Sequence, residues 1–308
     1  MILRFPKDLS VQHILAHGAE LATVMGMDRD SQGNRIRTYP ATQELAVVDF
    51  PSPVLVKDAH RITQLPPTVR DTVDKLYESA VRITQYDSTS MAFEQSRWPG
   101  VWGPSIDTLL FCKGLAGIPL DAVRTSVEIG AGSGFLTQRL LEQAPGMTHA
   151  AMVDIDPMAS ACQRELVHDY RVVAHTNDGI SFLQRGRYDL VLCNPPYIPR
   201  PNSVDDNPYE GVGLLANLLS DCASYLTPNG RLITNFSSLS EDLVLPIIEQ
   251  QRLRVRTLAE LEVPLKVLNV LNNAQWIGYL EARGLERRLR NGYEYWQGLR
   301  IVEVTPPR

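Results

Sequence analysis

The stretch Val127-Glu-Ile-Gly-Ala-Gly-Ser-Gly-Phe135 decides the fold. Its glycines, Gly130, Gly132 and Gly134, stand between an apolar segment and an amphipathic one, so the pattern predicts a strand, a tight turn and a helix. Glycine lets the backbone take positive φ and pass close to a ligand, and the free N–H groups of the following helix can face an electronegative group. The spacing is neither the GxGxxG of dinucleotide-binding folds nor that of a phosphate loop, which ends in GK[ST].

The elements around this turn alternate between strand and helix from about residue 125. Such alternation predicts the α/β class, with a doubly wound, mostly parallel sheet that carries helices on both faces. We expect strands over 125–129, 150–153, 171–175, 188–193, 231–236 and 299–304, and helices over 135–143, 158–167, 214–226 and 239–250.

Residues 1–90 have a different sequence pattern and are expected to form a smaller mixed α/β region. Residues 45–50 and 54–57 flank a Pro-Ser-Pro turn, which predicts a strand, a turn and a second strand. Two prolines then open a run of apolar positions spaced three and four apart, which predicts a helix over 68–85. We therefore divide the chain into an accessory or substrate-docking region over 1–90 and a second domain over 91–308.

Carboxylates stand at the ends of the predicted strands. Glu128 lies just before the glycine turn, and Asp154 follows the turn at the end of the next strand, where an acid can accept both hydroxyls of a ribose. Asp178 ends the third strand and could accept from an adenine amino group. Ile155 and Gly179, which follow these two acids, complete the predicted pocket. Because no Arg or Lys lies near the turn, such a pocket fits a positively charged nucleoside better than a pyrophosphate.

A second motif, Asn194-Pro195-Pro196-Tyr197, ends another apolar strand, and we predict that all four residues are catalytic. Two prolines in series stiffen the loop, which falls at the carboxyl end of a central strand, where such sheets bind ligands. The side-chain oxygen of Asn194 and the carbonyl of Pro195 can hold a planar NH₂ group, and Tyr197 can lie against the flat face of an amide or base. Methyl transfer from a sulfonium is an in-line displacement, so alignment supplies most of the catalysis.

The glycine turn and the Asn-Pro-Pro-Tyr loop together resemble the class I S-adenosylmethionine-dependent methyltransferases, specifically the Asn-Pro-Pro-Tyr group of N-methyltransferases. Within that group the chain is similar to the release-factor glutamine methyltransferase family. The resemblance covers about residues 90–304 and includes Glu210-Gly-Val-Gly-Leu214, which is similar to a Glu-Gly…Gly-Leu stretch of the family. It implies a seven-stranded Rossmann-like methyltransferase domain, S-adenosyl-L-methionine as the cofactor, and methyl transfer to nitrogen.

The resemblance also implies roles for residues and shows two departures. It implies that the glycine loop and Asp154 bind the cofactor, and that Asn194 and Pro195 hold the acceptor nitrogen, with Asn194 also beside the cofactor. In this chain Pro104-Ser-Ile-Asp-Thr108 stands where the family often carries Pro-Arg-Pro-Glu-Thr. Residues 39–57 look β-like where the family has a helical bundle that docks the protein substrate. Both departures concern the acceptor and leave the methyl-transfer chemistry unchanged.

Three functional classes stay open at this point. The first is an enzyme that methylates a nitrogen of a protein amide or of a small molecule. The second keeps the chemistry and targets an exocyclic amine of RNA or DNA, and a net charge of −5 without an evident nucleic-acid domain counts against it. The third is a binding module without catalysis, against which the intact Asn-Pro-Pro-Tyr loop argues.

Further candidates for contact with the substrate lie outside the two motifs. Phe93, Trp98 and Trp102 precede the glycine strand, and they can line the acceptor pocket or form core between two layers. Glu210 and Tyr197 complete the predicted substrate-binding set. The arginine-rich segment 283–290 lies in an insert before the last strand and is expected to form a solvated helix face.

Composition excludes several classes of protein. The chain has 308 residues, of which 44% are hydrophobic and 21% charged, so it can bury a large core without metal or disulfide support. No apolar stretch is long enough to span a bilayer, and the first residues do not resemble a signal peptide. Four cysteines without metal-ligand spacing predict buried free thiols in a reducing cytosol, and hence a cytoplasmic protein with no metal site. The oligomeric state is not indicated.

Overall fold

We describe a computed structural model of the chain. It describes residues 2–3, 27–29, 35–39, 44–47, 81–94, 97–201, 211–265, 268–271, 273–290 and 293–307. The expected strand over 54–57, most of the expected helix over 68–85, and the candidate Glu210 lie outside the described residues.

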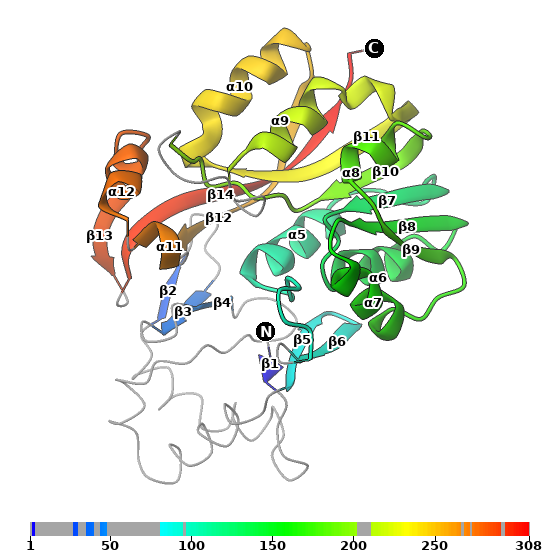
Figure 1. Ribbon diagram of the computed structural model, residues 1–308, viewed down its shortest axis with the longest axis horizontal. Helices are drawn as coiled ribbons and strands as arrows, with labels where there is room; N and C mark the ends of the chain where they lie inside the picture. The colour runs from blue at the N-terminus through cyan, green and yellow to red at the C-terminus, as the bar shows by residue number, and fades with distance from the viewer. Residues whose placement is uncertain are drawn as a thin grey trace, which may run out of the picture.

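The central sheet has eight described strands, of which seven follow the order β12-β14-β11-β10-β7-β8-β9 and the eighth, β13, pairs with β14 outside this path (Figure 1). Strands β11, β10, β7, β8 and β9 run parallel to one another, whereas β14 is antiparallel to β11, β12 and β13. The prediction of a doubly wound, mostly parallel, seven-stranded sheet is confirmed, and β13 is an addition. The strands are β7 (Thr125–Ile129), β8 (His149–Asp154), β9 (Val172–Thr176), β10 (Tyr188–Cys193), β11 (Leu226–Ser237), β12 (Arg254–Pro264), β13 (Glu286–Arg290) and β14 (Tyr293–Thr305).

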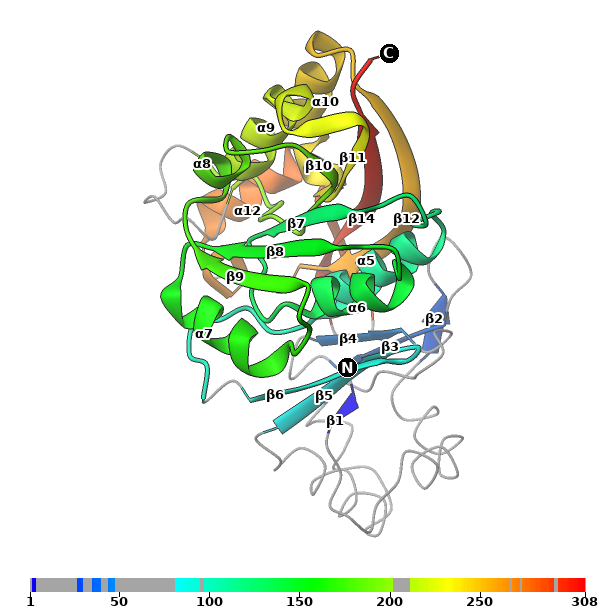
Figure 2. The same cartoon turned by 90° about the vertical axis from the view of Figure 1, so that its right-hand side faces the viewer.

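Helices cover both faces of this sheet. Figure 2 shows α5, α6 and α7 on one side of the strands and α8, α9 and α10 on the other. No helix in the described part of the chain is long and apolar enough to cross a membrane. The helices are α5 (Ile106–Ala116), α6 (Phe135–Gln143), α7 (Pro157–Leu166), α8 (Gly179–Leu183), α9 (Gly213–Ser220), α10 (Glu241–Gln250), α11 (Leu268–Leu271) and α12 (Ala274–Glu281), with the 3₁₀ turns η1 (Cys222–Ser224) and η2 (Ser238–Ser240).

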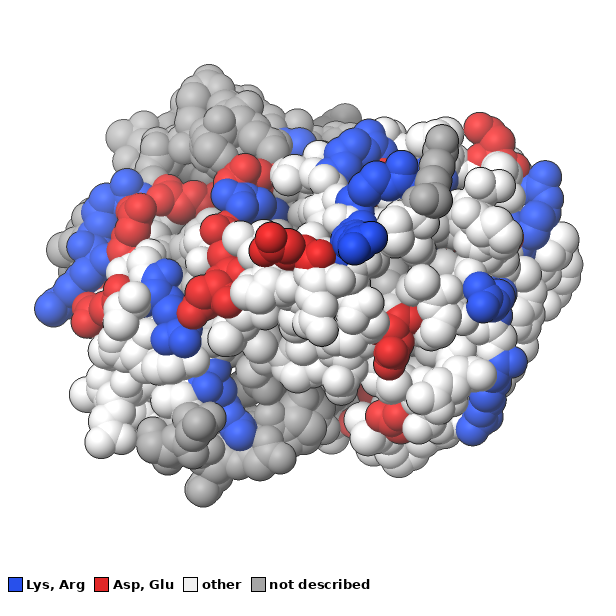
Figure 3. Space-filling model, turned by 90° about the horizontal axis from the view of Figure 1, so that it is seen from above, with Lys and Arg blue, Asp and Glu red and all other residues white. Residues whose placement is uncertain are grey.

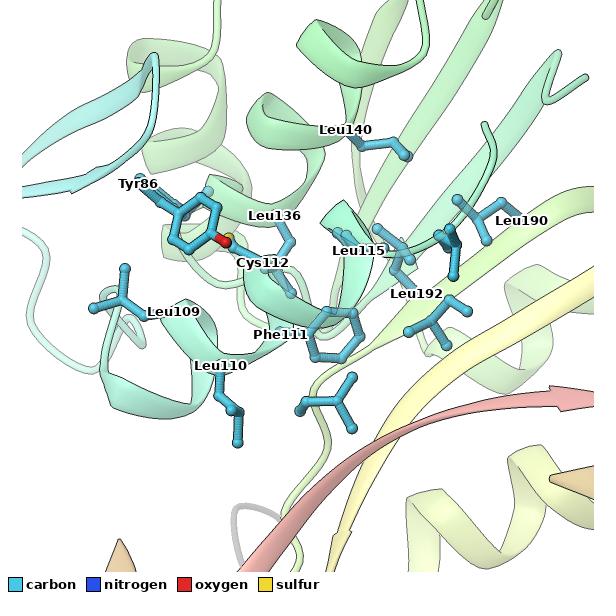
Figure 4. Packing of buried hydrophobic residues seen from close by; sticks show 14 of the residues in the cluster. Tyr86, Leu109, Leu110, Phe111, Cys112, Leu115, Leu136, Leu140, Leu190 and Leu192 are labelled. Carbon is cyan, nitrogen blue, oxygen red and sulfur yellow. The ribbon is translucent and has the colours of Figure 1, made fainter. Parts of the chain in front are cut away.

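The core has two layers because side chains alternate between the faces of each strand. In β10, Leu190 and Leu192 join the layer that includes α5 and α6, which Figure 4 shows from close by. Their neighbours Val191 and Cys193 join the layer formed with α8, α9 and α10. A strand buried on both faces is held rigidly, so the loops that leave its carboxyl end start from fixed positions. All four cysteines are free and buried.

The region before the sheet contains short strands in two smaller sheets. The first has the order β1-β5-β6, from β1 (Ile2–Leu3), β5 (Val81–Tyr86) and β6 (Thr89–Glu94), and the second has the order β2-β3-β4, from β2 (Met27–Arg29), β3 (Arg35–Tyr39) and β4 (Glu44–Val47). The prediction that residues 81–85 are helical is wrong, because they pair with β6. Strand pairing with β6 outweighs the helical spacing of the apolar residues in this segment.

Two other elements differ from the sequence-based expectation. The helix expected over 214–226 ends at Ser220, and β11 already begins at Leu226. The arginine-rich segment was expected as a helix face, but Glu286–Arg290 forms β13 and pairs with β14. Its neighbours α11 and α12 pack with Ile198 into a separate apolar cluster beside the Asn-Pro-Pro-Tyr loop.

Candidate active site

Three of the predicted motifs meet at one edge of the sheet. Ile129 in β7 pairs with Val153 on one side and with Cys193 on the other. Because these strands are parallel, the residues that follow them leave from the same edge. The glycine loop, Asp154 and Asn194 are therefore neighbours, at the place where doubly wound sheets bind ligands.

The glycine loop adopts a conformation that favours glycine at three positions. Gly130, Gly132 and Gly134 have φ of 64°, 51° and 82°. A Cβ on Gly132 would lie 2.6 Å from the carbonyl oxygen of Trp102, whereas a Cβ on Gly130 would meet nothing within 4 Å. The loop is thus packed on one side and open at Gly130, where its backbone can approach a ligand.

Asp154 stabilises this loop through a hydrogen bond and can accept further hydrogen bonds. Its Oδ2 accepts a hydrogen bond from the backbone N–H of Gly132 at 2.9 Å, and its Oδ1 accepts from the N–H of Asp156 at 3.0 Å. Each carboxylate oxygen has a second lone pair, so the side chain can still accept from a ligand hydroxyl. Burial raises the pKa of Asp154 above its usual value. Beside it Ile155 is 62% exposed and offers an apolar surface at the same edge.

Glu128 faces the inside of the protein. It is 4% exposed, and its Oε2 accepts from the hydroxyl of Thr137 at 2.6 Å and from the Thr137 backbone N–H at 2.9 Å. Burial raises the pKa of Glu128 to about 7, against the opposing effect of these two hydrogen bonds. In this structure its contacts fix the first turn of α6 under the glycine loop.

Asp178 and Gly179 lie at the carboxyl end of β9. Asp178 is exposed, and its Oδ1 accepts from the N–H of Ser181 at 2.8 Å, which caps α8. A Cβ on Gly179 would lie 2.3 Å from Cγ2 of Ile129, so glycine is required for the close packing of α8 on β7. Both residues keep the place that the sequence predicts, beside the ends of β7 and β8.

Asn194 is held by two polar side chains. Its Nδ2 donates to Oδ2 of Asp107 at 3.0 Å, and its Oδ1 accepts from Nδ2 of Asn235 at 2.8 Å. Asp107 lies in the first turn of α5 and is 7% exposed, while Asn235 lies in β11 and is fully buried. The Asn194 side chain is half-buried, so it is fixed from behind and reaches the edge of the sheet.

The rest of the loop is anchored to the sheet and to the insert. We define the proline loop as residues 194–199. The carbonyl of Tyr197 accepts from the hydroxyl of Ser237 at 3.1 Å, and the carbonyl of Pro199 accepts from the indole N–H of Trp276 in α12 at 2.8 Å. Burial, and then the nearby Asp107, raise the pKa of Tyr197, so its hydroxyl stays protonated. Pro195 is buried and Pro196 half-buried.

The three candidate aromatic residues differ in how far they are exposed. Phe93 and Trp98 are 1% and 8% exposed and pack with Cys162 of α7, so they form core and present little surface to a substrate. Trp102 is 65% exposed, and its carbonyl accepts from the N–H of Ser133 at 3.1 Å, which places it on the glycine loop. Of the three, only Trp102 has a large surface available beside the site.

Sequence reasoning missed three residues of this site. Asp107 had a signal, because the segment 104–108 keeps an acid at the position of the family's Pro-Arg-Pro-Glu-Thr motif. Asn235 had one too, because it is a polar residue near the end of the predicted strand 231–236. Trp276 had no local signal, since its contact with the proline loop spans 77 positions.

Comparison with known proteins identifies relatives of this chain. Residues 109–245 match the family model of the methyltransferase small domain. Methyltransferase HEMK2 of Mus musculus is 32% identical over 108 residues, which are 33% of this chain and 50% of that protein. A putative protein N5-glutamine methyltransferase of Methanocaldococcus jannaschii is 27% identical over 191 residues, which are 56% of this chain and 91% of that protein. The chain thus spans half of the mouse relative and nine-tenths of the archaeal one.

Among solved structures, the N-methyltransferase NodS of Bradyrhizobium japonicum in complex with S-adenosyl-L-homocysteine is similar, with a TM-score of 0.40 and 14% identity over 65% of this chain and 85% of that one. The family match and the sequence relatives confirm the expected resemblance to class I S-adenosylmethionine-dependent N-methyltransferases of the glutamine methyltransferase type. Residues 109–245 are therefore similar to a methyltransferase domain.

Proposed function

We propose, from this resemblance to methyltransferases, that the chain transfers a methyl group from S-adenosyl-L-methionine to a side-chain amide nitrogen of a protein. The observation that carries the proposal is the position of Asn194, which follows β10 directly beside the glycine loop. Two features support it further: the stiff proline loop and the archaeal relative, which is described as a putative protein N5-glutamine methyltransferase.

The residues at the sheet edge fit the proposed cofactor. Gly130 leaves open space for close approach, Asp154 has free lone pairs for ribose hydroxyls, and Ile155 offers an apolar face for a base. Asp178 at the end of β9 is exposed and can accept from an exocyclic amino group. The cofactor supplies an electrophilic methyl group on a positively charged sulfur.

The chain's own contribution is to hold and orient the acceptor. Oδ1 of Asn194 and the carbonyl of Pro195 accept from the two N–H bonds of an acceptor NH₂ group, and this points the nitrogen lone pair away from the loop. Tyr197 lies beside the acceptor plane. Because the displacement is in line, holding the acceptor in this alignment lowers the entropic part of the activation barrier relative to a reaction in solution. The polar, partly buried surroundings favour charge that moves during transfer.

A nucleic-acid acceptor is the second candidate. A tRNA1(Val) (adenine(37)-N6)-methyltransferase of Escherichia coli is 31% identical over 85 residues, which are 26% of this chain and 35% of that protein. The charges of the described surface count against this candidate. On the face shown in Figure 3, Lys and Arg are interspersed with Asp and Glu. The insert's Arg283 and Arg287 form ion pairs with Asp242 at 3.2 Å and Glu294 at 2.7 Å, so they are already neutralised.

Several predictions about the whole protein belong to the same proposal. We keep residues 1–90 as an accessory region that docks the acceptor and 91–308 as the methyltransferase domain, with Trp102 and Glu210 as candidates for acceptor contact. A small-molecule amine stays an alternative acceptor. The buried free cysteines support a reducing, cytoplasmic location.

Labelling decides between the acceptor classes. The protein is incubated with S-adenosylmethionine that carries a tritiated methyl group and with a cell lysate separated into protein, nucleic-acid and small-molecule fractions. We expect the label in the protein fraction, on glutamine after digestion. Label in RNA or DNA would favour the second candidate, and label in no fraction would contradict the proposal.

Replacement of the central residue tests the assignment within the site. Asn194→Ala should reduce methyl transfer by about 100-fold or more, because the acceptor loses its orientation, while cofactor affinity stays nearly unchanged. Initial rates and calorimetric titration with S-adenosyl-L-homocysteine measure the two effects. Asn217→Ala, on the exposed side of α9, is the matched control and should leave both unchanged. Turnover that survives in Asn194→Ala would contradict the assignment.

A further inference from the structure

Three polar side chains from distant parts of the chain form a row behind the proline loop. Asp107 from α5, Asn194 from the proline loop and Asn235 from β11 are joined by hydrogen bonds of 3.0 and 2.8 Å. The two outer residues are buried, so water competes little for these bonds. The middle residue is the one that holds the acceptor in the proposed function, on which this inference rests.

The row fixes the orientation of the Asn194 amide, with its NH₂ group toward Asp107 and its oxygen toward Asn235. Oδ2 of Asp107 accepts from Nδ2 of Asn194, so the NH₂ end of the amide lies on the Asp107 side. A flipped amide would set the Asn194 oxygen against the carboxylate and leave both without a donor. Asn235 alone could not make this choice, because its own amide can flip and either donate or accept. Asp107 therefore sets the orientation.

Asn235 holds the orientation that Asp107 sets. Its Nδ2 donates to the Asn194 oxygen, while its own Oδ1 is buried and has no hydrogen-bond partner. A buried amide oxygen without a donor is unfavourable. The protein keeps this arrangement, which fills one lone pair of the Asn194 oxygen and leaves the other lone pair for a ligand.

We infer that Asp107 and Asn235 are positioning residues that fix the Asn194 amide so that its Oδ1, rather than its NH₂ group, is presented to the acceptor. The site then selects an acceptor that carries N–H donors on the reacting nitrogen, as in a neutral amide or amine. It disfavours an acceptor whose nitrogen has only a lone pair to offer, such as a ring nitrogen. The two residues act through Asn194 and do not touch the reacting atoms.

Asp107→Asn tests the inference, because an amide can donate or accept and no longer selects one orientation. We expect kcat for methylation of the protein fraction to fall about 10- to 100-fold, with the affinity for S-adenosyl-L-homocysteine within two-fold of the wild type. Asp189→Asn is the matched control. Asp189 accepts from the backbone N–H groups of Arg124 and Thr125 at the opposite edge of the sheet, so its loss should lower stability without lowering kcat.

A second variant and a spectroscopic measurement test the inference independently, in case Asp107→Asn does not fold. Asn235→Asp places a carboxylate on each side of the Asn194 amide, and we expect a similar loss of kcat. In protein labelled with ¹⁵N-asparagine, the side-chain amide of Asn194, assigned by its absence in Asn194→Asp, should exchange slowly with solvent in the wild type and faster in Asp107→Asn.

The outcomes separate the inference from the proposed function. A wild type that methylates the protein fraction, together with an Asp107→Asn variant of unchanged kcat, overturns the inference alone. An Asn194 amide that exchanges as fast as a free amide in the wild type also overturns it. A wild type that binds cofactor and methylates nothing overturns the proposed function and the positioning role with it.

Discussion

At the scale of the residue, two carboxylates in a similar sequence context have different roles in the structure. Glu128 and Asp154 both stand at strand ends next to the glycine loop, and a single pattern predicts both as cofactor contacts. The structure shows Glu128 bonded to Thr137 inside the protein and Asp154 at the edge of the sheet. Position along the strand decides this difference, because Glu128 pairs in register with Met152, and Asp154 lies beyond Met152 at the carboxyl end of β8.

Asp154→Ala should weaken cofactor binding more than it affects stability. The variant loses the proposed ribose acceptor and the bond that fixes Gly132, and we expect affinity for S-adenosyl-L-homocysteine to fall about 10- to 100-fold. Calorimetric titration measures the change. Asp156→Ala is the matched control, because Asp156 caps α7 through the N–H of Met158; it should reduce stability by about 1 kcal/mol and leave affinity unchanged. Equal losses of affinity in both variants would contradict the assignment.

Glu128 should make the protein less stable as the pH rises. Its pKa is about 7 in the folded protein against 4.5 for the free side chain, so between these values the folded state binds more protons than the unfolded state. The free energy of unfolding therefore falls through this window, by on the order of 1–3 kcal/mol, and stays lower above it. Urea unfolding at pH 5 and pH 8 should show a smaller decrease for Glu128→Gln than for the wild type. The same decrease in both would refute the role of Glu128.

At the scale of the element, the parallel strands and their helices could be predicted from the sequence, and the connections to the site could not. The helix over 135–143 and the strand over 188–193 match α6 and β10 because their local patterns agree with their burial. The helix expected over 81–85 is β5, since pairing with β6 overrides a local preference. In the row Asp107–Asn194–Asn235, the two hydrogen bonds join residues that are 87 and 41 positions apart in the sequence, so no local pattern could predict them.

The glycine loop should tolerate no side chain at its packed position. Gly132→Ala combines positive φ with a Cβ 2.6 Å from the Trp102 carbonyl, so we expect a loss of about 1–3 kcal/mol in stability and weak cofactor binding. Gly278→Ala is the contrasting variant. It lies in the exposed interior of α12 with open space around it, and it should stabilise the protein by about 0.5–1 kcal/mol. Thermal unfolding of both variants checks the pair.

The insert should support turnover through one hydrogen bond. Trp276→Phe removes the N–H that the carbonyl of Pro199 accepts, so the proline loop loses an anchor, and we expect kcat to fall several-fold with cofactor affinity unchanged. Trp296→Phe removes a similar bond, to the carbonyl of Arg288, which is not part of the proline loop. It should lower stability and leave kcat unchanged. Equal kcat in the two variants would argue against support by the insert.

At the scale of the whole molecule, the account joins a rigid sheet to loops at one edge. Both faces of the sheet are buried, so the three strand ends that carry the glycine loop, Asp154 and Asn194 keep their spacing. The domain that holds these motifs was predictable because the motifs are local. The acceptor was not, because its recognition depends on surfaces assembled from residues far apart in the sequence.

The most direct test of the account is a crystal structure of the protein with S-adenosyl-L-homocysteine. We predict that the ligand lies over Gly130, with its ribose at Asp154 and its sulfur directed toward Asn194. A ligand bound elsewhere, or a fully occupied ligand whose sulfur points away from Asn194, would contradict the central claim.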